Sequence, residues 1–411
     1  MKPPAERPRS ERPPSGRPPS GRPLRILIGA ETYPPDVNGA ARFAERLATG
    51  LAGRGHEIHV VTPSPEGAPF RRQADGVTVH GVRSHRYFMR PDFQVCMPWV
   101  AGPATAALME EIDPDVVHTQ AHMVVGRGVV NAAARTGRPL VATNHFMPEN
   151  LAAHAPIPRP LQRIGYRIAW KDLGRVFGKA DAVTAPTPRA VELLVRSAGL
   201  RDAFPVSCGI DAERYHCATP DPDAVPTVLF VGRMDREKRV DELIRAFAAL
   251  PAHVPARLEL VGDGPEREAW TGLVETLGIG HRVRFRGFVS EEELVEAYAH
   301  ADVFCMPGIA ELQSLVTLEA MASGTPVVAA DAMALPHLVR PGRNGWLYTP
   351  GDVPELTTRL AALLSDPALR RRMGAAGLEI VAEHDIGATL DTFEDVYRSL
   401  DARHRVQIRA A

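Results

Sequence analysis

Cysteine is scarce in this chain of 411 residues, and so are long apolar runs. The four cysteines contain no Cys-x-x-Cys pair, so neither a zinc site nor a disulfide framework is expected, and the pattern fits a reducing cytoplasm. No run of eighteen apolar residues occurs, which excludes an apolar membrane-spanning helix. The N-terminus has no apolar core of the signal-peptide kind. The sequence therefore predicts a cytoplasmic protein.

The net charge is also small, because 48 basic and 49 acidic side chains leave a net charge of −1. No overall field attracts nucleic acid, and no nucleic-acid partner is expected. The exception is residues 1–23, which carry six basic and two acidic side chains, a net of +4, and eight prolines. A segment of this composition cannot bury a core, so we expect a disordered tail rich in Pro and Arg.

Short β-rich runs that alternate with helical stretches make up most of the remaining chain. Residues 24–29 form the first such run, a helix is expected over 40–54, and a second strand over 57–62. The alternation starts again at Thr227 and continues to a strand over 326–329. Repeated units of this kind predict parallel sheets that are covered by helices on both faces.

The restart of the pattern predicts two domains of the same class. We expect an α/β chain with two doubly wound, Rossmann-like domains that face a central cleft, an N-terminal domain over 24–208 and a C-terminal domain over 209–385. Residues 386–411 are expected to form a helix that returns to the N-terminal domain. The join is a stretch rich in Asp and Pro near 208–226. Small ligands most often bind where two domains meet.

Two glutamates eight residues apart, Glu311 and Glu319, lie in a mostly apolar run. A buried carboxylate is costly unless another group pairs with it. A helix is expected to begin near Ser314, and its first free amides, including that of Leu315, can receive a phosphate. Glu319 would then reach a ribose diol beside that phosphate. Glu311, which precedes the helix, would meet the hydroxyls of a sugar.

Two cations follow the first strand of the second half. Gly232 lets the chain turn close to a ligand. Arg233 and Lys238 are five residues apart on a loop and can converge on a diphosphate, the first as a planar fork and the second as a point charge. A pair of solvated surface charges is the alternative. The glutamate pair in the same half of the chain favours the binding role.

In combination these motifs resemble the retaining, nucleotide-sugar-dependent glycosyltransferases of family four, which have the two-domain GT-B fold. The resemblance covers roughly residues 24–400. It rests on one motif in the first half and four in the second: Thr32-Tyr-Pro-Pro-Asp-Val-Asn-Gly-Ala-Ala41, Gly232-Arg-x4-Lys238, Val261-Gly-Asp-Gly-Pro265, Arg286-Gly-Phe-Val289 and Glu311-x7-Glu319. This chain departs from the family at Gln313-Ser314, where Phe-Gly is commoner.

The resemblance implies a role for each matched residue. Glu319 would bind the ribose of the nucleotide, and Glu311 the hydroxyls of the donor sugar. Arg233 and Lys238 would neutralise the leaving diphosphate. The remaining contacts to the donor nucleotide are implied for the backbone near the base and the phosphates, at Gly39, Gly232, Val289, Ser314 and Leu315.

Two histidines of the first half, His118 and His145, are expected at the carboxyl ends of strands, facing the cleft. The resemblance implies a place near the donor sugar and the acceptor, and hence a part in catalysis. A purely structural role is the alternative. Gln120 stands where many members of the family have a further histidine. We name no general base, because the departing phosphate can take the proton of the acceptor.

No metal ion or other cofactor is expected. The chain has two Asp-x-Asp segments, but Asp113-Pro-Asp115 precedes its strand and Asp221-Pro-Asp223 lies in the join. Arg233, Lys238 and the free amides at the start of a helix can instead stabilise the leaving diphosphate by preorganised electrostatics. The prediction is a metal-independent hexosyltransferase.

The donor predicted from the resemblance is a nucleotide sugar similar to UDP-glucose, and the acceptor is a hydroxyl of a small molecule or a lipid. The variant loop at Gln313 is most similar to members that act on diacylglycerol-type glycolipids. The alternatives are a GDP-mannose-dependent α-mannosyltransferase, a nucleotide-sugar epimerase and a non-catalytic sensor. A dehydrogenase is excluded because the first half lacks the Gly-x-Gly-x-x-Gly turn.

Basic residues recur at four-residue intervals over 159–179, with apolar residues between them. A basic amphipathic helix can lie on an anionic membrane, which would place the protein peripherally on the inner face of the cell membrane. However, a four-residue step drifts by about 40° on a helix of 3.6 residues per turn, so the basic row does not form one face. A solvated helix with a buried apolar side is the alternative.

Overall fold

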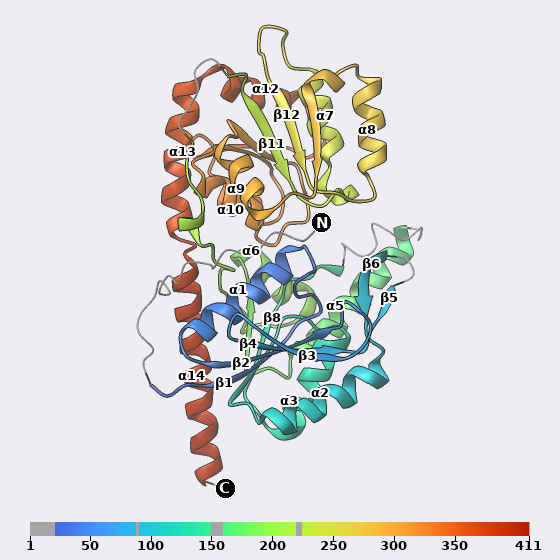
Figure 1. Cartoon of the computed structure of the whole chain (residues 1–411), viewed down its shortest axis with the longest axis vertical. Coiled ribbons are helices and arrows are strands. Elements are labelled where there is room, and N and C mark those ends of the chain that lie inside the picture. The colour runs from blue at the N-terminus through green and yellow to red at the C-terminus, as the bar shows by residue number, and fades with distance from the viewer. Residues whose placement is uncertain (1–20, 88–89, 149–158, 219–223, 411) are drawn as a thin grey trace, which may run out of the picture.

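The computed structural model of the protein describes residues 21–87, 90–148, 159–218 and 224–410. Two lobes lie one above the other along the long axis of the molecule (Figure 1). The N-terminal lobe is built on an eight-stranded sheet and the C-terminal lobe on a six-stranded sheet. The predicted α/β class is therefore confirmed. Most of the predicted tail, residues 1–20, and the segment Asp221-Pro-Asp223 lie outside the described residues.

The sheet of the N-terminal lobe has the order β10-β9-β8-β7-β1-β2-β4-β3. Only β3 runs antiparallel to its neighbour. Its strands are β1 (Arg25–Gly29), β2 (Glu57–Pro63), β3 (Phe70–Ala74), β4 (Val77–Val82), β7 (Val116–Thr119), β8 (Leu140–Thr143), β9 (Ala182–Ala185) and β10 (Phe204–Pro205). Its helices are α1 (Gly39–Gly53), α2 (Pro98–Ile112), α3 (Val124–Thr136), α5 (Arg159–Phe177) and α6 (Pro188–Leu193), and a separate antiparallel hairpin holds β5 (His85–Tyr87) and β6 (Arg90–Val95).

The sheet of the C-terminal lobe is parallel throughout, with the order β13-β12-β11-β14-β15-β16. Its strands are β11 (Thr227–Val231), β12 (Arg257–Val261), β13 (Val283–Gly287), β14 (Val303–Met306), β15 (Val327–Ala330) and β16 (Gly345–Tyr348). Its helices are α7 (Val240–Ala248), α8 (Arg267–Thr276), α9 (Glu291–Ala299), α10 (Leu315–Ala322), α11 (Leu335–Leu338), α12 (Val353–Ser365) and α13 (Pro367–Ala382).

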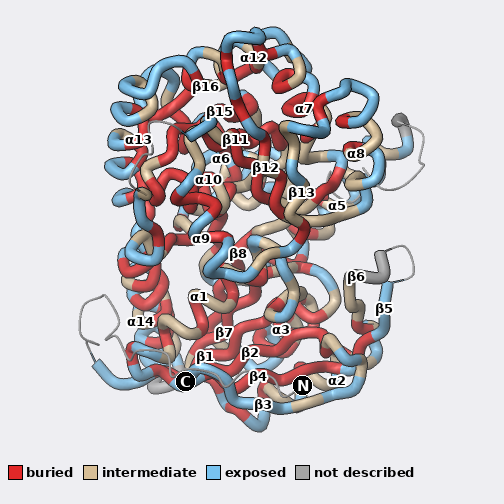
Figure 2. Tube along the Cα trace, turned by 45° about the horizontal axis from the view of Figure 1, so that its top comes forward, coloured by how far each residue is buried: buried red, intermediate tan, exposed pale blue. Residues whose placement is uncertain are grey.

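The central strands are buried, as Figure 2 shows. All four residues of β14 and of β15 are buried, which explains why both strands are continuous apolar runs in the sequence. The covering helices bury one side each. In α7, Val240, Leu243 and Phe247 are fully buried because they recur at helical spacing. Each such side chain contributes roughly 1.5–3 kcal/mol relative to an exposed one.

The polypeptide passes between the lobes twice, at adjacent points. Ile210 and Asp385 form an isolated parallel bridge, in which the Ile210 amide donates to the His384 carbonyl at 2.8 Å. We call residues 206–211 and 384–386 the two interlobe passages. The second passage leads into α14 (Ile386–Ala410), which runs down the side of the N-terminal lobe (Figure 1).

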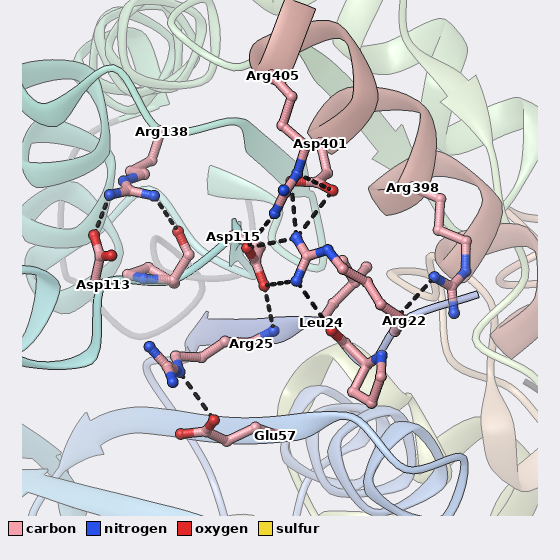
Figure 3. Close-up of polar contacts among 12 residues, drawn as sticks. Arg22, Leu24, Arg25, Glu57, Asp113, Asp115, Arg138, Arg398, Asp401 and Arg405 are labelled. Carbon is pink, nitrogen blue, oxygen red and sulfur yellow. Dashed lines mark hydrogen bonds and ion pairs between the residues drawn. The ribbon is translucent and has the colours of Figure 1, made fainter. Parts of the chain in front are cut away.

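An ionic cluster joins α14 to the start of the first strand (Figure 3). Asp115, the residue before β7, accepts a hydrogen bond from the Arg25 amide at 2.8 Å and pairs with Arg22 at 2.7 Å and with Arg405 at 3.2 Å. Asp113 pairs with Arg138. The carboxylates of Asp113-Pro-Asp115 are thus occupied by arginines at the amino-terminal edge of the sheet.

Candidate active site

The predicted donor-binding residues lie where the strand order of the C-terminal lobe reverses. From β11 the chain proceeds outward to β12, and from β14 it proceeds outward to β15 in the opposite direction. The loops that follow β11 and β14 therefore diverge at their carboxyl ends, which is where ligands bind in open α/β sheets. Gly232 and Arg233 follow β11, and residues 307–314 follow β14.

Two helix N-termini face each other at this point. Helix α10 begins at Leu315 and helix α1, from the N-terminal lobe, begins at Gly39. A Cβ atom added to Gly39 would lie 4.0 Å from Cδ1 of Leu315. The first amides of a helix lack intrahelical partners and carry partial positive charge. The arrangement can therefore hold an anion between the lobes.

Lys238, which ends a short 3-10 helix after β11, forms an ion pair with Glu311, in the loop after β14. Gly308 lies against both, because a Cβ atom there would be 3.3 Å from Oε1 of Glu311 and 3.4 Å from Cδ of Lys238. Burial by itself lowers the pKa of Lys238, but the Glu311 carboxylate outweighs burial and the pKa lies above its ordinary value. The amine is therefore charged at neutral pH, beside the N-terminus of α10.

Arg233 is held between the two lobes. Its guanidinium pairs with the carboxylate of Asp235, which is fully buried. The same guanidinium lies over the ring of Phe93, in β6 of the opposite lobe, at 5.5 Å from the ring centroid. A cation in contact with an aromatic face is attracted by the ring quadrupole. Contacts from both lobes thus fix the orientation of the Arg233 guanidinium, which suits the binding of a diphosphate.

Glu319 is 1% exposed and has a partner on each oxygen. Oε1 accepts a hydrogen bond from Arg46, on α1 of the opposite lobe, at 3.0 Å. Oε2 accepts one from the hydroxyl of Tyr298, on α9, at 2.9 Å. These two contacts explain how the buried carboxylate is tolerated. Neither partner was predicted from the sequence; the recurrence of Arg42 and Arg46 four residues apart on the polar side of α1 is the signal that could have indicated one of them.

The remaining donor residues lie at the same edge of the sheet. Ser314 is the N-cap of α10, with a left-handed backbone (φ 69°), and its hydroxyl is 2.8 Å from that of Thr317. Val289 lies in the loop between β13 and α9. The next residue, Ser290, begins α9 with a capping box that includes Glu293.

His118 differs from its expected orientation. It lies inside β7, is fully buried, and points toward α14. Nδ1 is 2.6 Å from the Tyr397 hydroxyl and Nε2 is 2.7 Å from Oγ1 of Thr143. Burial, with a smaller effect of His145, lowers the pKa of His118 to about 3. A strand alternates its side chains between two faces, and this one faces the covering helix, so both ring nitrogens are occupied by protein groups.

His145 follows β8 and leaves one nitrogen unused. Its ring packs against Phe43 at 4.7 Å between centroids, and Nδ1 is 3.9 Å from Sγ of Cys208. Burial lowers the pKa of His145 to about 4. Among the described residues, Nε2 of His145 and both amide atoms of Gln120 are buried without a hydrogen-bond partner. Buried polar atoms need partners, so this part of the N-terminal lobe can receive a polar ligand.

Glu31 was not considered in the sequence analysis. It follows β1, at the point where β1 lies between β7 and β2, and its carboxylate accepts a hydrogen bond from the Gly126 amide at 3.0 Å. Burial raises the pKa of Glu31 to about 7, against the opposing effect of the amides of Gly126 and Val125. A Glu in the loop after a first strand does not by itself predict this contact. The start of α3 comes close to Glu31 only through the tertiary fold.

Two family models match the chain. Residues 37–214 match the model described as Glycosyltransferase Family 4, and residues 211–379 match the one described as Glycosyl transferases group 1. The chain is 32% identical over 399 residues to a GDP-mannose-dependent alpha-mannosyltransferase of Mycolicibacterium smegmatis, covering 94% of this chain and 100% of that protein. It is 31% identical over 355 residues to the sulfoquinovosyl transferase SQD2 of Arabidopsis thaliana, covering 82% and 65%.

Solved structures are also similar to this one. Sucrose-phosphate synthase from Thermosynechococcus elongatus aligns with a TM-score of 0.78 at 23% identity, over 92% of this chain and all of that one. Anabaena Alr3699/HepE in complex with UDP aligns with a TM-score of 0.69 at 21% identity, over the same shares. At these identities the likeness shows the fold, in which two Rossmann-like lobes stand opposite each other.

Proposed function

We propose that this chain, which belongs to glycosyltransferase family 4 and has the GT-B fold, moves a hexose from a nucleoside-diphosphate sugar to an acceptor hydroxyl with retention of configuration. One observation carries the proposal: the N-terminus of α1 approaches that of α10, and the loop that leads into α10 carries Glu311 in its ion pair with Lys238. Cations and free amides at one place suit a diphosphate.

The chemistry follows from charge. When the glycosyl–phosphate bond breaks, negative charge develops on the diphosphate. Arg233, Lys238 and the Leu315 amide would stabilise that charge by preorganised electrostatics, once the donor shares the ion pairs of Arg233 with Asp235 and of Lys238 with Glu311. Glu311 would accept hydrogen bonds from hydroxyls of the sugar, and Glu319 from the ribose. The departing phosphate takes the proton of the acceptor, while the unpartnered atoms of Gln120 and His145 bind polar groups nearby.

The donor is either GDP-mannose or a UDP-glucose-like sugar. A relative that this chain covers from end to end is named a GDP-mannose-dependent alpha-mannosyltransferase, which supports GDP-mannose at least as well as the UDP-glucose expected from the sequence. The test is a panel of UDP, GDP, UDP-glucose and GDP-mannose, scored by thermal unfolding. Saturation at 100 times Kd should stabilise the native state by about 2.7 kcal/mol.

Turnover assays with the same sugar nucleotides separate the alternatives to transfer, which binding alone does not. An epimerase would convert the sugar nucleotide without an acceptor, and a sensor would bind it without any turnover. Transfer of a labelled hexose to an added acceptor, with release of UDP or GDP, is the outcome that supports the proposal. Absence of affinity for every nucleotide of the panel would refute it.

We further propose that catalysis requires no metal ion, because Arg233, Lys238 and the helix amides supply the positive charge. Turnover measured with excess EDTA should equal turnover without it. Loss of activity on chelation, restored by Mg²⁺ or Mn²⁺, would show that a metal supplies part of the charge. A metal-dependent glycosyltransferase assayed in the same EDTA buffer is the control.

The acceptor proposed is a lipid at an anionic membrane surface. On α5, the apolar side chains of Leu161, Ile164 and Ile168 are 57%, 55% and 63% exposed, and the basic residues Arg163 and Arg167 beside them are exposed as well. Such a face suits the headgroup region of a bilayer. The name of the Arabidopsis relative, a sulfoquinovosyl transferase, agrees with a glycolipid product. No helix in the described part of the chain is both long and apolar enough to cross a bilayer.

Sedimentation with vesicles tests this contact. The protein should bind vesicles that contain an anionic lipid, and the double variant Arg163→Glu, Arg167→Glu should bind markedly less. The matched control is Arg371→Glu, Arg372→Glu, which makes the same change of charge on exposed residues of α13 in the other lobe. Equal binding by both double variants, or binding without regard to lipid charge, would exclude α5 as the membrane contact.

A further inference from the structure

The loop that carries Glu311 is fastened to the opposite lobe. The carbonyl of Leu312 accepts a hydrogen bond from Oγ1 of Thr187 at 2.9 Å. Thr187 belongs to the N-terminal lobe, where it caps α6. The Leu312 side chain packs against the apolar core of the same lobe. The residue that follows Glu311 is therefore held from outside its own lobe.

The next residue, Gln313, is bound to both interlobe passages. It is 3% exposed. Its Oε1 accepts a hydrogen bond from the Cys208 amide at 2.7 Å, and its Nε2 donates to Oγ of Ser207 at 2.6 Å. Nε2 also lies 3.4 Å from Nδ1 of His384, in the second passage. One amide group therefore serves as acceptor and donor at once, which fixes its orientation.

We propose that Gln313 is a positioning residue for hexosyl transfer, and that its amide locks the loop from Glu311 to Ser314 in place against the two interlobe passages. This inference rests on the proposed function, because only there do Glu311 and the first amides of α10 contact the donor. Gln313 contacts no reacting atom; it acts through the residues on either side of it.

Two physical reasons explain why the hydrogen bonds of Gln313 should affect the rate of hexosyl transfer. The donor sugar must meet Glu311 and the acceptor together, and a misplacement of about 1 Å can cost on the order of 10²-fold in rate. Ser314 also has a left-handed backbone, a conformation that persists in a non-glycine residue only when its surroundings enforce it. Gln313, directly before Ser314 and two residues after Glu311, is the side chain best placed to do so.

The test compares Gln313→Leu and Gln313→Glu with the wild type. The first removes the donor and the acceptor, and the second preserves size and the acceptor for the Cys208 amide. We expect kcat to fall on the order of 10- to 100-fold in Gln313→Leu and by less in Gln313→Glu. The Kd for UDP or GDP should change by less than about threefold, because the ribose contact at Glu319 is untouched.

Asn344→Leu is the matched control. Asn344 is a fully buried amide in the C-terminal lobe. It is hydrogen-bonded to the Arg340 amide at 2.8 Å and to the Leu338 carbonyl at 3.0 Å, and its amide lies 3.7 Å from Sδ of Met321, so none of these contacts involves the loop from Glu311 to Ser314. Asn344→Leu should lower Tm as the Gln313 variants do but leave kcat of the folded enzyme unchanged.

The experiment distinguishes failure of the positioning role of Gln313 from failure of the proposed hexosyl transfer. A wild type that transfers from no nucleotide sugar refutes the function itself. A wild type that transfers, together with folded Gln313→Glu protein of wild-type kcat, refutes only the positioning role. So does a fall in kcat that Asn344→Leu shares, since that would report lost stability alone. Gln313→Glu keeps the size of the side chain, so the test remains decisive if Gln313→Leu does not fold.

Discussion

At the scale of single residues, the charged groups of the site are paired within the protein. Lys238 pairs with Glu311, Arg46 hydrogen-bonds Glu319, and Arg233 pairs with Asp235. A donor must therefore share these ion pairs or replace them, and the affinity measured for a nucleotide is a difference between two sets of strong contacts. Removing one partner of a buried ion pair lowers the free energy of unfolding, because the other charge is left buried without a counter-ion. Substitutions here are best made isosteric.

Glu319→Gln should weaken binding of UDP and GDP alike, by roughly tenfold or more, because a hydrogen bond to a charged group contributes about 1.5–3 kcal/mol. Isothermal titration with each nucleotide measures the change. Glu296→Gln, at an exposed position on α9, is the control and should bind as the wild type does. Unchanged affinity in Glu319→Gln would remove the ribose contact from the proposal.

Glu311→Gln should lower kcat far more than it lowers nucleotide affinity, since the partner of Glu311 in the reaction is the sugar. It also removes the carboxylate that contributes most to raising the pKa of Lys238, so that burial is then opposed mainly by Glu237 and this pKa falls. The amine then loses its proton at a lower pH, and the alkaline limit of residual activity should move to lower pH. Rate–pH profiles of both enzymes measure this. Turnover at the wild-type level would contradict the role of Glu311.

At the scale of elements, α14 packs against the N-terminal lobe as if it were one of that lobe's own helices. Arg54, at the end of α1, is 4% exposed and pairs with Asp391 at 2.7 Å and Glu394 at 3.2 Å on α14. The hydroxyl of Tyr397 reaches His118 in the sheet. The order of strands and helices could be predicted from apolar periodicity, and the strand expected over 57–62 is β2, Glu57–Pro63. A return of residues 386–411 to the N-terminal domain was expected, but the contacts of α14 with α1 and β7 were not, because no local pattern in the sequence specifies them.

Arg54→Met should destabilise the protein by about 1.5–3 kcal/mol, because the buried Glu394 loses a charged hydrogen-bond partner and keeps only Arg398. Urea denaturation measures the free energy of unfolding. The control is Arg71→Met, whose pair with Glu111 is more than half exposed on both sides, and which should change stability by less than about 0.5 kcal/mol. Equal effects of the two substitutions would mean that α14 is not held by Arg54.

At the scale of the whole molecule, the two-lobe architecture and the residues of the C-terminal lobe that gather at its switch point were predictable from sequence. Contacts between lobes were not. The pairing of Arg46 with Glu319 joins residues 273 positions apart, and the bond from Thr187 to Leu312 joins residues 125 apart. Such pairs depend on how the lobes are set against each other, which no local pattern encodes. The same applies to Gln313, which in the sequence was only a departure from the family.

Acid should destabilise the whole protein below about pH 6.5. Burial is the largest cause that lowers the pKa of five histidines, to about 3 for His118 and about 4 for His80, His122, His145 and His384. In the unfolded chain each has a pKa near 6.5. Between roughly pH 6.5 and 4 the unfolded chain therefore binds more protons, and the free energy of unfolding falls by at most about 1.4 kcal/mol per pH unit for each histidine.

Protonation of Glu31 has the opposite effect on the free energy of unfolding. Burial raises its pKa to about 7, so between roughly pH 4.5 and 7 the native state is the one that holds the proton. Burial also lowers the pKa of His56 and His337 and raises the pKa of Glu45, Glu237 and Asp401. Seven histidines therefore outnumber four carboxyls, and stability falls with acid. Urea denaturation at pH 7, 6 and 5 measures the slope, which should be smaller by about one proton in His122→Phe and unchanged in a variant of the exposed His300. Stability that is constant or rises toward pH 5 would contradict this account.

The adjacency of the two interlobe passages has a consequence for limited proteolysis. A single nick in either passage would leave the lobes tethered through the other, and the bridge between Ile210 and Asp385 would keep the severed ends side by side. Both fragments should then migrate together on a sizing column and separate only under denaturant. Rotation of one lobe over the other should likewise follow a single axis through that pair, because neither connection can lengthen without stretching its neighbour.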